Sequence, residues 1–462
     1  MRSLLFSVLL MMAASLSGCG GHESKPSPKP SPEVKPAPVP LELGKVVPFL
    51  PGVQGNAALA YYLPASYSAN QKWPVVVFFD SHARGKDPVR KYAPLAEQYG
   101  LILIGSNASK NGQQPQMSLQ IYDALLAEIG KQFSYDAGRM ILSGFSGGAR
   151  VAAMIAQNRP NVAGVIGCSA GFQPRLGDAF PYYATMGRED FNYQELRGLE
   201  ATLDQGSQPH FVDFWDGGHE WPPVEVMERA LEFAVIRASK PGSAVLDSLV
   251  AEAQAHLTEA KAAAKSSTMA LWRVHKRFAT LLDGHADVAP LKAEAERLQK
   301  SPGWTKEFQD EEQLAKTEET LRQQYVQQIG TATIDEWFRI AIRLQDTGGS
   351  LPQRQCNLRV ANFLSLNVYF QVDGALKAGD IAQAEHFQKI YSFIDPPNPE
   401  HAYMLAGIRQ RQGRTAEVMP ALEYAQRLGF KDADRLSMDP DFVNLHSNAD
   451  FMKLLDSLRV AE

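Results

Sequence analysis

Three motifs in the first half of the chain carry residues suited to nucleophilic catalysis. Ser146 stands at the centre of Gly-Phe-Ser-Gly-Gly, directly after the strand-like run 140–143. Asp190 and His219 each follow a later strand-like run, in Gly-Arg-Glu-Asp and Gly-Gly-His-Glu-Trp-Pro. A serine attacks a carbonyl once a histidine takes its proton, and a carboxylate orients that histidine. The chain order Ser, Asp, His therefore predicts a catalytic triad.

The pattern Gly-x-Ser-x-Gly between a strand and a helix is typical of a nucleophile elbow. The turn is so tight that the serine adopts a strained backbone, and glycines two positions away avoid a clash. The backbone N–H of Gly147 is then the expected first donor to a developing oxyanion. We expect a second donor from Ser81 or His82, which follow the strand-like run 74–80.

Residues 45–240 resemble a compact α/β hydrolase of the secreted esterase kind. Gly-Gly-His-x-Trp-Pro around His219 is similar to the motif of feruloyl-esterase and polyhydroxybutyrate-depolymerase relatives, and residues 187–190 match the Gly-x-x-Asp acid turn. The resemblance implies hydrolysis of carboxylic esters through an acyl-enzyme. The loop 79–85 departs from the usual His-Gly of the oxyanion loop, which leaves the position of that donor open.

Several residues near these motifs have two interpretations. Glu189, Asp213 and Asp216 compete with Asp190 for the role of the acid. His82 is either an ordinary loop histidine or part of the site. Three aromatic residues either line the acyl pocket or pack in the core: Trp215, Trp221 and Phe172. Cys168 and Cys356 are interpreted as small core residues.

Alternating elements must position these residues. Apolar strand-like runs recur with helices between them, at 58–63, 74–80, 101–106, 140–143, 163–170, 182–187 and 211–216. This pattern predicts a doubly wound, mostly parallel sheet, with the site at the carboxyl ends of its strands. The segment between residues 170 and 182 is too short for a cap domain, so we expect an open site.

The N-terminus predicts an anchored protein. Residues 1–18 read as a signal peptide with an apolar run too short to span a bilayer. They end in Leu-Ser-Gly before Cys19, which resembles a bacterial lipobox with Cys19 as the lipidated residue. Residues 19–40 are rich in proline and predict an extended tether. We therefore expect a bacterial cell-envelope location, at the outer membrane or facing the periplasm.

The second half of the chain differs in composition. Residues 241–350 are rich in Ala, Glu, Lys, Leu and Gln, which predicts long amphipathic helices. Residues 351–462 resemble degenerate tetratricopeptide-type hairpins, because the turn residues Gly379 and Gly413 are 34 positions apart (413 − 379), the period of that repeat. Such repeats form protein-binding surfaces, so a protein partner is expected there.

Charge and residue content narrow the function. The formal net charge of −5 provides no global basic field for nucleic acid. No metal cluster or cofactor motif is found, and three cysteines form no disulfide framework. The leading hypothesis is a lipid-anchored serine esterase whose hydrolase domain, residues 41–240, folds on its own. A serine peptidase on the same fold and an inactive hydrolase-like scaffold remain alternatives.

Overall fold

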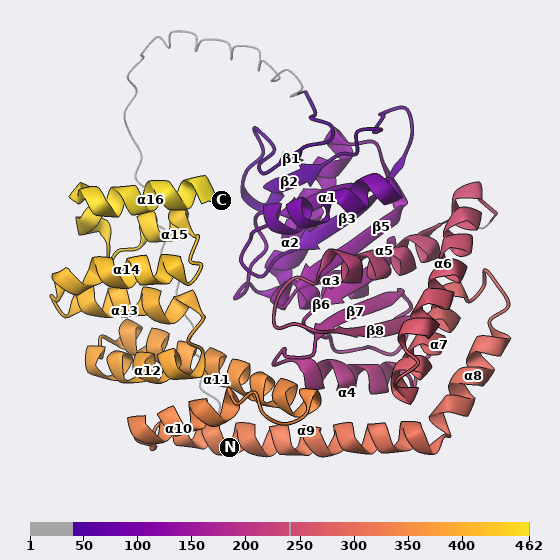
Figure 1. Ribbon diagram of the computed structural model, residues 1–462. Coiled ribbons are helices and arrows are strands. Elements are labelled where there is room, and N and C mark those ends of the chain that lie inside the picture. Colours follow the sequence, from indigo (N-terminus) through magenta and orange to yellow (C-terminus); the bar gives the residue numbers. More distant parts are fainter. Residues whose placement is uncertain (1–39, 240–241, 462) are drawn as a thin grey trace, which may run out of the picture. The chain divides into compact units, whose positions relative to one another are not determined.

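A twisted eight-stranded sheet forms the centre of the first half of the chain in the computed structural model, which describes residues 40–239 and 242–461 (Figure 1). The strand order is β1-β2-β4-β3-β5-β6-β7-β8. The strands from β3 to β8 pair in parallel, while β2 runs antiparallel to both β1 and β4. Their bounds are β1 Val46–Val47, β2 Leu59–Tyr62, β3 Trp73–Phe79, β4 Ile102–Ser106, β5 Tyr135–Phe145, β6 Val162–Cys168, β7 Tyr182–Gly187 and β8 His210–Trp215.

Helices cover both faces of this sheet (Figure 1). Helices α1 (Lys86–Tyr99) and α5 (Val224–Ala238) pack together on one face, and α2 (Pro115–Gln132) and α3 (Gly147–Asn158) pack on the other. Helix α4 (Tyr193–Leu203) contacts β7 and β8. The central strands are buried on both sides, as expected of apolar parallel strands. The predicted fold class, an α/β-hydrolase sheet followed by a helical region, is confirmed.

The second half of the described chain is helical (Figure 1). Two apolar clusters hold the later helices together, one centred on α9 to α12 and one on α13 to α16, while α6 to α8 join the core of the sheet. The bounds of these helices are α6 Ala244–Ala263, α7 Thr268–Leu282, α8 Ala289–Gln299, α9 Pro302–Gln328, α10 Ile334–Leu344, α11 Leu351–Ala378, α12 Ile381–Ile394, α13 Pro399–Arg411, α14 Val418–Arg427, α15 Ala433–Met438 and α16 Ala449–Ala461.

The two glycines that suggested a repeat lie at turns between helices. Gly379 caps α11 with a left-handed φ of 75°, and Gly413 follows α13 with a φ of 72°. Helix α11 packs against α12, and α13 packs against α14. These contacts make two helical hairpins; their assignment to the tetratricopeptide class stays a prediction.

The hydrophobic core of the sheet continues beyond residue 240. One buried cluster joins strand residues such as Phe78 and Tyr183 to Leu246 of α6 and to Phe278 and Leu282 of α7. Helices α6 and α7 therefore cover apolar surface of the half of the chain that forms the sheet, and α7 also contacts β8. This packing argues against the expectation that residues 41–240 fold on their own.

Candidate active site

Ser146 occupies a strained turn between β5 and α3. Its φ of 54° and ψ of −121° lie where non-glycine residues are uncommon. Its N–H donates to the carbonyl of Cys168 at the end of β6, at 2.8 Å. A Cβ on Gly144 would lie 2.0 Å from the carbonyl oxygen of Gly148, and one on Gly148 would lie 1.9 Å from that of Phe79. The glycines on either side of Ser146 thus permit the close approach of α3 to β3 and β5.

The structure brings Ser146, His219 and Asp190 into one hydrogen-bonded row. His219 Nε2 lies 3.0 Å from Ser146 Oγ, and His219 Nδ1 lies 2.9 Å from Asp190 Oδ2. Asp190 is fully buried, and its other oxygen accepts the N–H of Asn192 at 2.8 Å. A buried carboxylate with a defined second partner keeps a single orientation, which suits it to hold an imidazole ring.

The other acids considered from the sequence have different partners. Asp213 Oδ2 accepts from Arg229 at 2.7 Å and from the hydroxyl of Tyr183 at 3.1 Å. The side chain of Asp216 is 74% exposed and accepts from Gln355. The geometry around His219 therefore favours Asp190 over these two acids.

Two aromatic rings contact the imidazole of His219, and sequence analysis did not single them out. The ring centroid of Phe191 is 4.3 Å from that of His219, and the centroid of Phe145 is 4.9 Å away. These rings restrict the tilt of the imidazole. Their only sequence signal is adjacency, since Phe191 follows the acid and Phe145 precedes the serine.

The loop 79–85, which was predicted to supply an oxyanion donor, is organised by Asp80 at the end of the preceding strand-like run. This carboxylate is 5% exposed and accepts the N–H of His82 at 2.8 Å and the indole N–H of Trp221 at 3.0 Å. The carbonyl of Ser81 accepts the N–H of Asn111 at 2.9 Å. The carboxamide of Asn111 lies beside Gly147, where a Cβ would approach its Oδ1 to 1.8 Å. Asn111 thus borders the elbow and is a second residue that sequence reasoning missed.

One of the two candidate donors of this loop, His82, already makes hydrogen bonds within the loop. The N–H of His82 is used within the loop by Asp80. The imidazole Nδ1 of His82 lies within hydrogen-bond distance of Ser81 Oγ, at 2.9 Å, and the side chain is 62% exposed. The side chain of His82 thus belongs to the loop and to the cleft beside it.

The three predicted pocket aromatics all take part in packing. The ring of Trp221 contacts those of Phe78, Tyr92 and Phe145 while its N–H reaches Asp80. Trp215 is 7% exposed, and its ring fills the space that a Cβ on Gly217 would need. Phe172 packs on Phe180 and Tyr182. That these rings also contact substrate stays a prediction.

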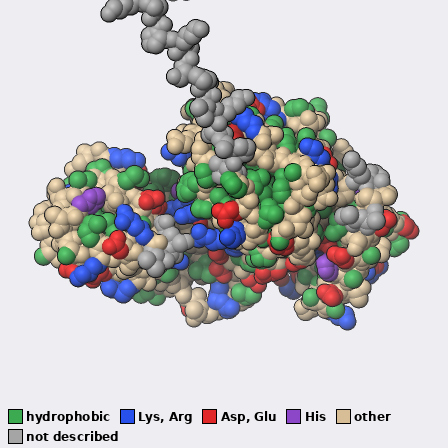
Figure 2. Space-filling view, turned by 90° about the horizontal axis from the view of Figure 1, so that it is seen from above, with side chains coloured by type: hydrophobic (Ala, Val, Ile, Leu, Met, Phe, Trp, Pro, Cys, Tyr) green, Lys and Arg blue, Asp and Glu red, His purple; other side chains and the backbone are tan. Residues whose placement is uncertain are grey.

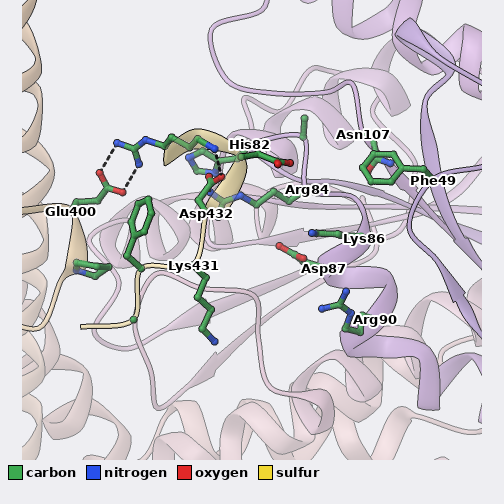
Figure 3. Close-up of a pocket in the computed structure, with 16 residues that line it drawn as sticks. Phe49, His82, Arg84, Lys86, Asp87, Arg90, Asn107, Glu400, Lys431 and Asp432 are labelled. Carbon is green, nitrogen blue, oxygen red and sulfur yellow. Dashed lines mark hydrogen bonds and ion pairs between the residues drawn. The ribbon is translucent and has the colours of Figure 1, made fainter. Parts of the chain in front are cut away.

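A cleft of about 590 Å³ opens beside the loop 79–85 (Figure 3). One wall is formed by His82, Arg84 and the start of α1, and the other by residues of the C-terminal helical region. An ion pair of 3.1 Å joins Arg84 to Asp432 across it. The segment 169–181 contains no helix, in line with the predicted lack of a cap between β6 and β7, yet the helical region supplies a wall instead.

Metal ligands do not mark a further site on the described residues. Basic and acidic side chains are interspersed on the face seen in Figure 2. Among residues 40–239 and 242–461, no group of three or more His, Cys, Asp or Glu could hold a metal ion. No helix in the same ranges is both long and apolar enough to cross a bilayer.

Cys168 and Cys356 are buried and unbridged. Burial raises the pKa of the Cys168 thiol to about 12, although the hydroxyls of Thr185 and Ser143 oppose the change. This thiol is therefore protonated at neutral pH and is a poor nucleophile. The backbone carbonyl of Cys168 accepts the hydrogen bond from the N–H of Ser146. Cys19 lies outside the described residues.

Comparison with known proteins shows likeness at the level of structure. No family model and no curated protein matches the chain. The S-formylglutathione hydrolase of Staphylococcus aureus is 14% identical, covering 38% of this chain and 90% of its own, with a TM-score of 0.33. Esterase B from Lactobacillus rhamnosis, inhibited by a tributyrin phosphonate, is 17% identical over 42% of this chain and 86% of its own, with a TM-score of 0.35. A feruloyl esterase module from Clostridium thermocellum, complexed with sinapinate, is 15% identical over 38% of this chain and 81% of its own, with a TM-score of 0.30. These likenesses assign no activity to this chain.

Proposed function

We propose that this protein is a serine hydrolase that cleaves carboxylic esters through an acyl-enzyme intermediate. The observation that supports it most strongly is the row from Ser146 Oγ through His219 to Asp190, with separations of 3.0 and 2.9 Å. The strained elbow and the helix that begins at Gly147 add to it, because both are arranged around the serine hydroxyl. No cofactor is required by this chemistry.

The proposed reaction uses each group in turn. Ser146 Oγ attacks the acyl carbon while its proton passes to His219 Nε2, and Asp190 stabilises the resulting imidazolium. Collapse of the tetrahedral intermediate breaks the bond to the alcohol oxygen, which leaves with the proton from His219. Water then attacks the acyl-serine and gives a proton to His219. Collapse of this second intermediate breaks the bond to Ser146 Oγ, which takes the proton back from His219, and the acid is released.

Two backbone N–H groups are proposed to stabilise the oxyanion. The first belongs to Gly147, at the positive end of α3. For the second we favour the N–H of Ser81 over that of His82, because His82 already donates to Asp80. Asp80 and Trp221 then act as supports that hold this loop in place.

A fluorophosphonate probe and a paired set of substrates test the proposal. We expect the probe to label Ser146 and a short-chain aryl ester to be hydrolysed, with little cleavage of the matching anilide. Faster turnover of the anilide would favour the peptidase alternative. Absence of both labelling and hydrolysis would favour the inactive scaffold.

The histidine base predicts a dependence of rate on pH. The base works only when its imidazole is neutral, so turnover should rise from acid pH to a plateau around neutrality. The measurement is the initial rate of aryl-ester hydrolysis across a buffer series at constant ionic strength. A rate that stays constant between about pH 5 and 8 would argue against a histidine base.

The protein is further proposed to be held at the cell envelope through lipidated Cys19, with the helical region available to a protein partner. Cys19→Ala should release the protein from membranes or block its maturation, because the alkyl chains would be missing. Fractionation of cells into membrane and soluble pools measures this. Wild-type protein found wholly in the soluble periplasmic pool would contradict the anchor, and Cys356→Ala serves as the control variant.

A further inference from the structure

The turn that carries Asp190 is held from outside the hydrolase half. Three of its carbonyls accept hydrogen bonds from the helical region. The carbonyl of Arg188 accepts from Arg359 Nη1 at 2.7 Å, and that of Glu189 accepts from Asn362 Nδ2 at 2.8 Å. The carbonyl of Phe191 accepts from Arg322 Nη2 at 2.8 Å. The carbonyls on both sides of the acid are therefore bound by α9 and α11.

The hydrolase half binds the opposite edge of the same turn. The N–H of Arg188 donates to the carbonyl of Trp215 at 2.8 Å, and the N–H of Glu189 donates to that of Gly217 at 2.9 Å. The acid turn is thus clamped between the loop that leads to His219 and the two helices. A shift of the helices would move Asp190 relative to His219.

The two arginine donors are paired with one buried carboxylate, Glu318. Glu318 is fully buried; it accepts from Arg359 Nε at 2.7 Å, and Arg322 Nη2 forms an ion pair with its other oxygen at 2.6 Å. Gln194 of α4 also donates to Glu318, at 2.8 Å. Arg359 lies over the ring of Tyr193 at 4.5 Å and is 4% exposed. Separating these charges would leave a buried carboxylate without its cations, which is strongly destabilising.

From these contacts we propose that Asn362 and Arg359 are positioning residues for Asp190, so that the helical region forms part of the catalytic apparatus. The inference rests on the proposed function, since it gives a role to contacts around the proposed acid. Asn362 acts through a single neutral hydrogen bond to the backbone of Glu189 and touches neither Ser146 nor His219 in the contacts described. Its replacement therefore perturbs the turn with the least disturbance elsewhere.

The first test compares Asn362→Leu and Asn362→Asp with a matched control. Leucine keeps the size but removes the donor, and aspartate directs a charged acceptor at the carbonyl of Glu189. Asn367→Leu is the control, because Asn367 lies on the same helix and donates only to the carbonyl of Phe363 within that helix. We expect both Asn362 variants to lower kcat about 10- to 100-fold with KM nearly unchanged, since misplacement by about 1 Å costs on that order. Unchanged kcat in both, or an equal fall in the control, would overturn the proposal.

A second measurement separates positioning from general stability. If Asn362 acts through Asp190, then Asn362→Leu should cost little further activity in an Asp190→Asn background, because residues that act as a unit are non-additive. Thermal melts of all variants show whether each is folded. A full additional loss in the double variant would mean that Asn362 acts by another route.

A third readout does not depend on any substrate. The Nδ1 proton of His219, hydrogen-bonded to Asp190, should give a far-downfield proton resonance, which Asn362→Leu should weaken or shift and Asn367→Leu should not. A shifted resonance in a protein without esterase activity would support the positioning role while contradicting the proposed function. An unshifted resonance together with normal kcat in the variant would contradict the positioning role alone.

Discussion

Replacement of Ser146 by alanine is expected to lower kcat for a short-chain aryl ester by on the order of 10⁴- to 10⁶-fold. The hydroxyl is the only atom of this residue that can form the acyl-enzyme, and it lies 3.0 Å from His219 Nε2. His219→Ala should cause a loss of similar size. The double variant should be little worse than either single one, because the remaining rate comes from substrate binding and oxyanion stabilisation.

The controls for this series lie close to the site. Asp190→Asn should cost about 10⁴-fold, because an amide stabilises the wrong tautomer of His219. Asp216→Asn should leave kcat within about twofold of wild type, since the side chain of Asp216 is mostly exposed and an exposed ion pair contributes little. Full activity of Ser146→Ala would rule out the proposed mechanism. A large loss of kcat in Asp216→Asn without one in Asp190→Asn would assign the role of the triad acid to Asp216 instead.

The local parts of this site were accessible from sequence because each is encoded over a few neighbouring residues. A glycine pattern around Ser146 reports a tight turn, and an apolar run before Asp190 or His219 reports the end of a buried strand. Parallel strands then bring those ends to one edge of the sheet. The predicted strand 140–143 was too short because β5 begins at Tyr135, which pairs with Trp73 although polar residues follow it.

The contacts that support the site could not be read in the same way. Arg359 and Arg188 are 171 positions apart, and Trp221 and Asp80 are 141 apart. An arginine on an amphipathic helix has the same sequence signature whether it faces solvent or a buried carboxylate. Only the packing of α9 and α11 against the acid turn distinguishes the two. The change of composition after residue 240 indicated a change of secondary structure, but it does not mark the end of the hydrophobic core, which includes residues from both sides of this position.

Cutting the chain at residue 240 is therefore expected to yield an aggregated protein. Nine buried residues of the shared core lie in the removed part: Leu246, Leu249, Ala253, Phe278, Ala279, Leu281, Leu282, Val288 and Leu291. Their removal would expose the apolar side chains that they cover in the remaining half, and burial of each large apolar side chain contributes roughly 1.5–3 kcal/mol. The loss of several such burials is comparable with the whole stability of a typical domain, roughly 5–15 kcal/mol.

The same cut would strip two buried carboxylates of their partners. Glu200 is held by Arg273 at 3.1 Å and Lys276 at 3.0 Å; burial alone would raise its pKa, but these cations lower it below the ordinary value. Glu232, which is 3% exposed, is held by Arg277 at 2.7 Å. A carboxylate left buried without a cation is strongly destabilising.

A longer fragment separates folding from positioning. Residues 41–300 retain the shared core and the partners of both carboxylates, but lack α9 and α11, which hold the acid turn. We expect this fragment to be soluble and cooperatively folded, with kcat on a small ester well below that of the full chain, whereas residues 41–240 should not fold. Circular dichroism melts and ester turnover of the two fragments and the full chain measure both effects. A soluble, fully active 41–240 fragment would show that the hydrolase half is self-sufficient, and a fully active 41–300 fragment would show that the acid turn holds its geometry without the helices.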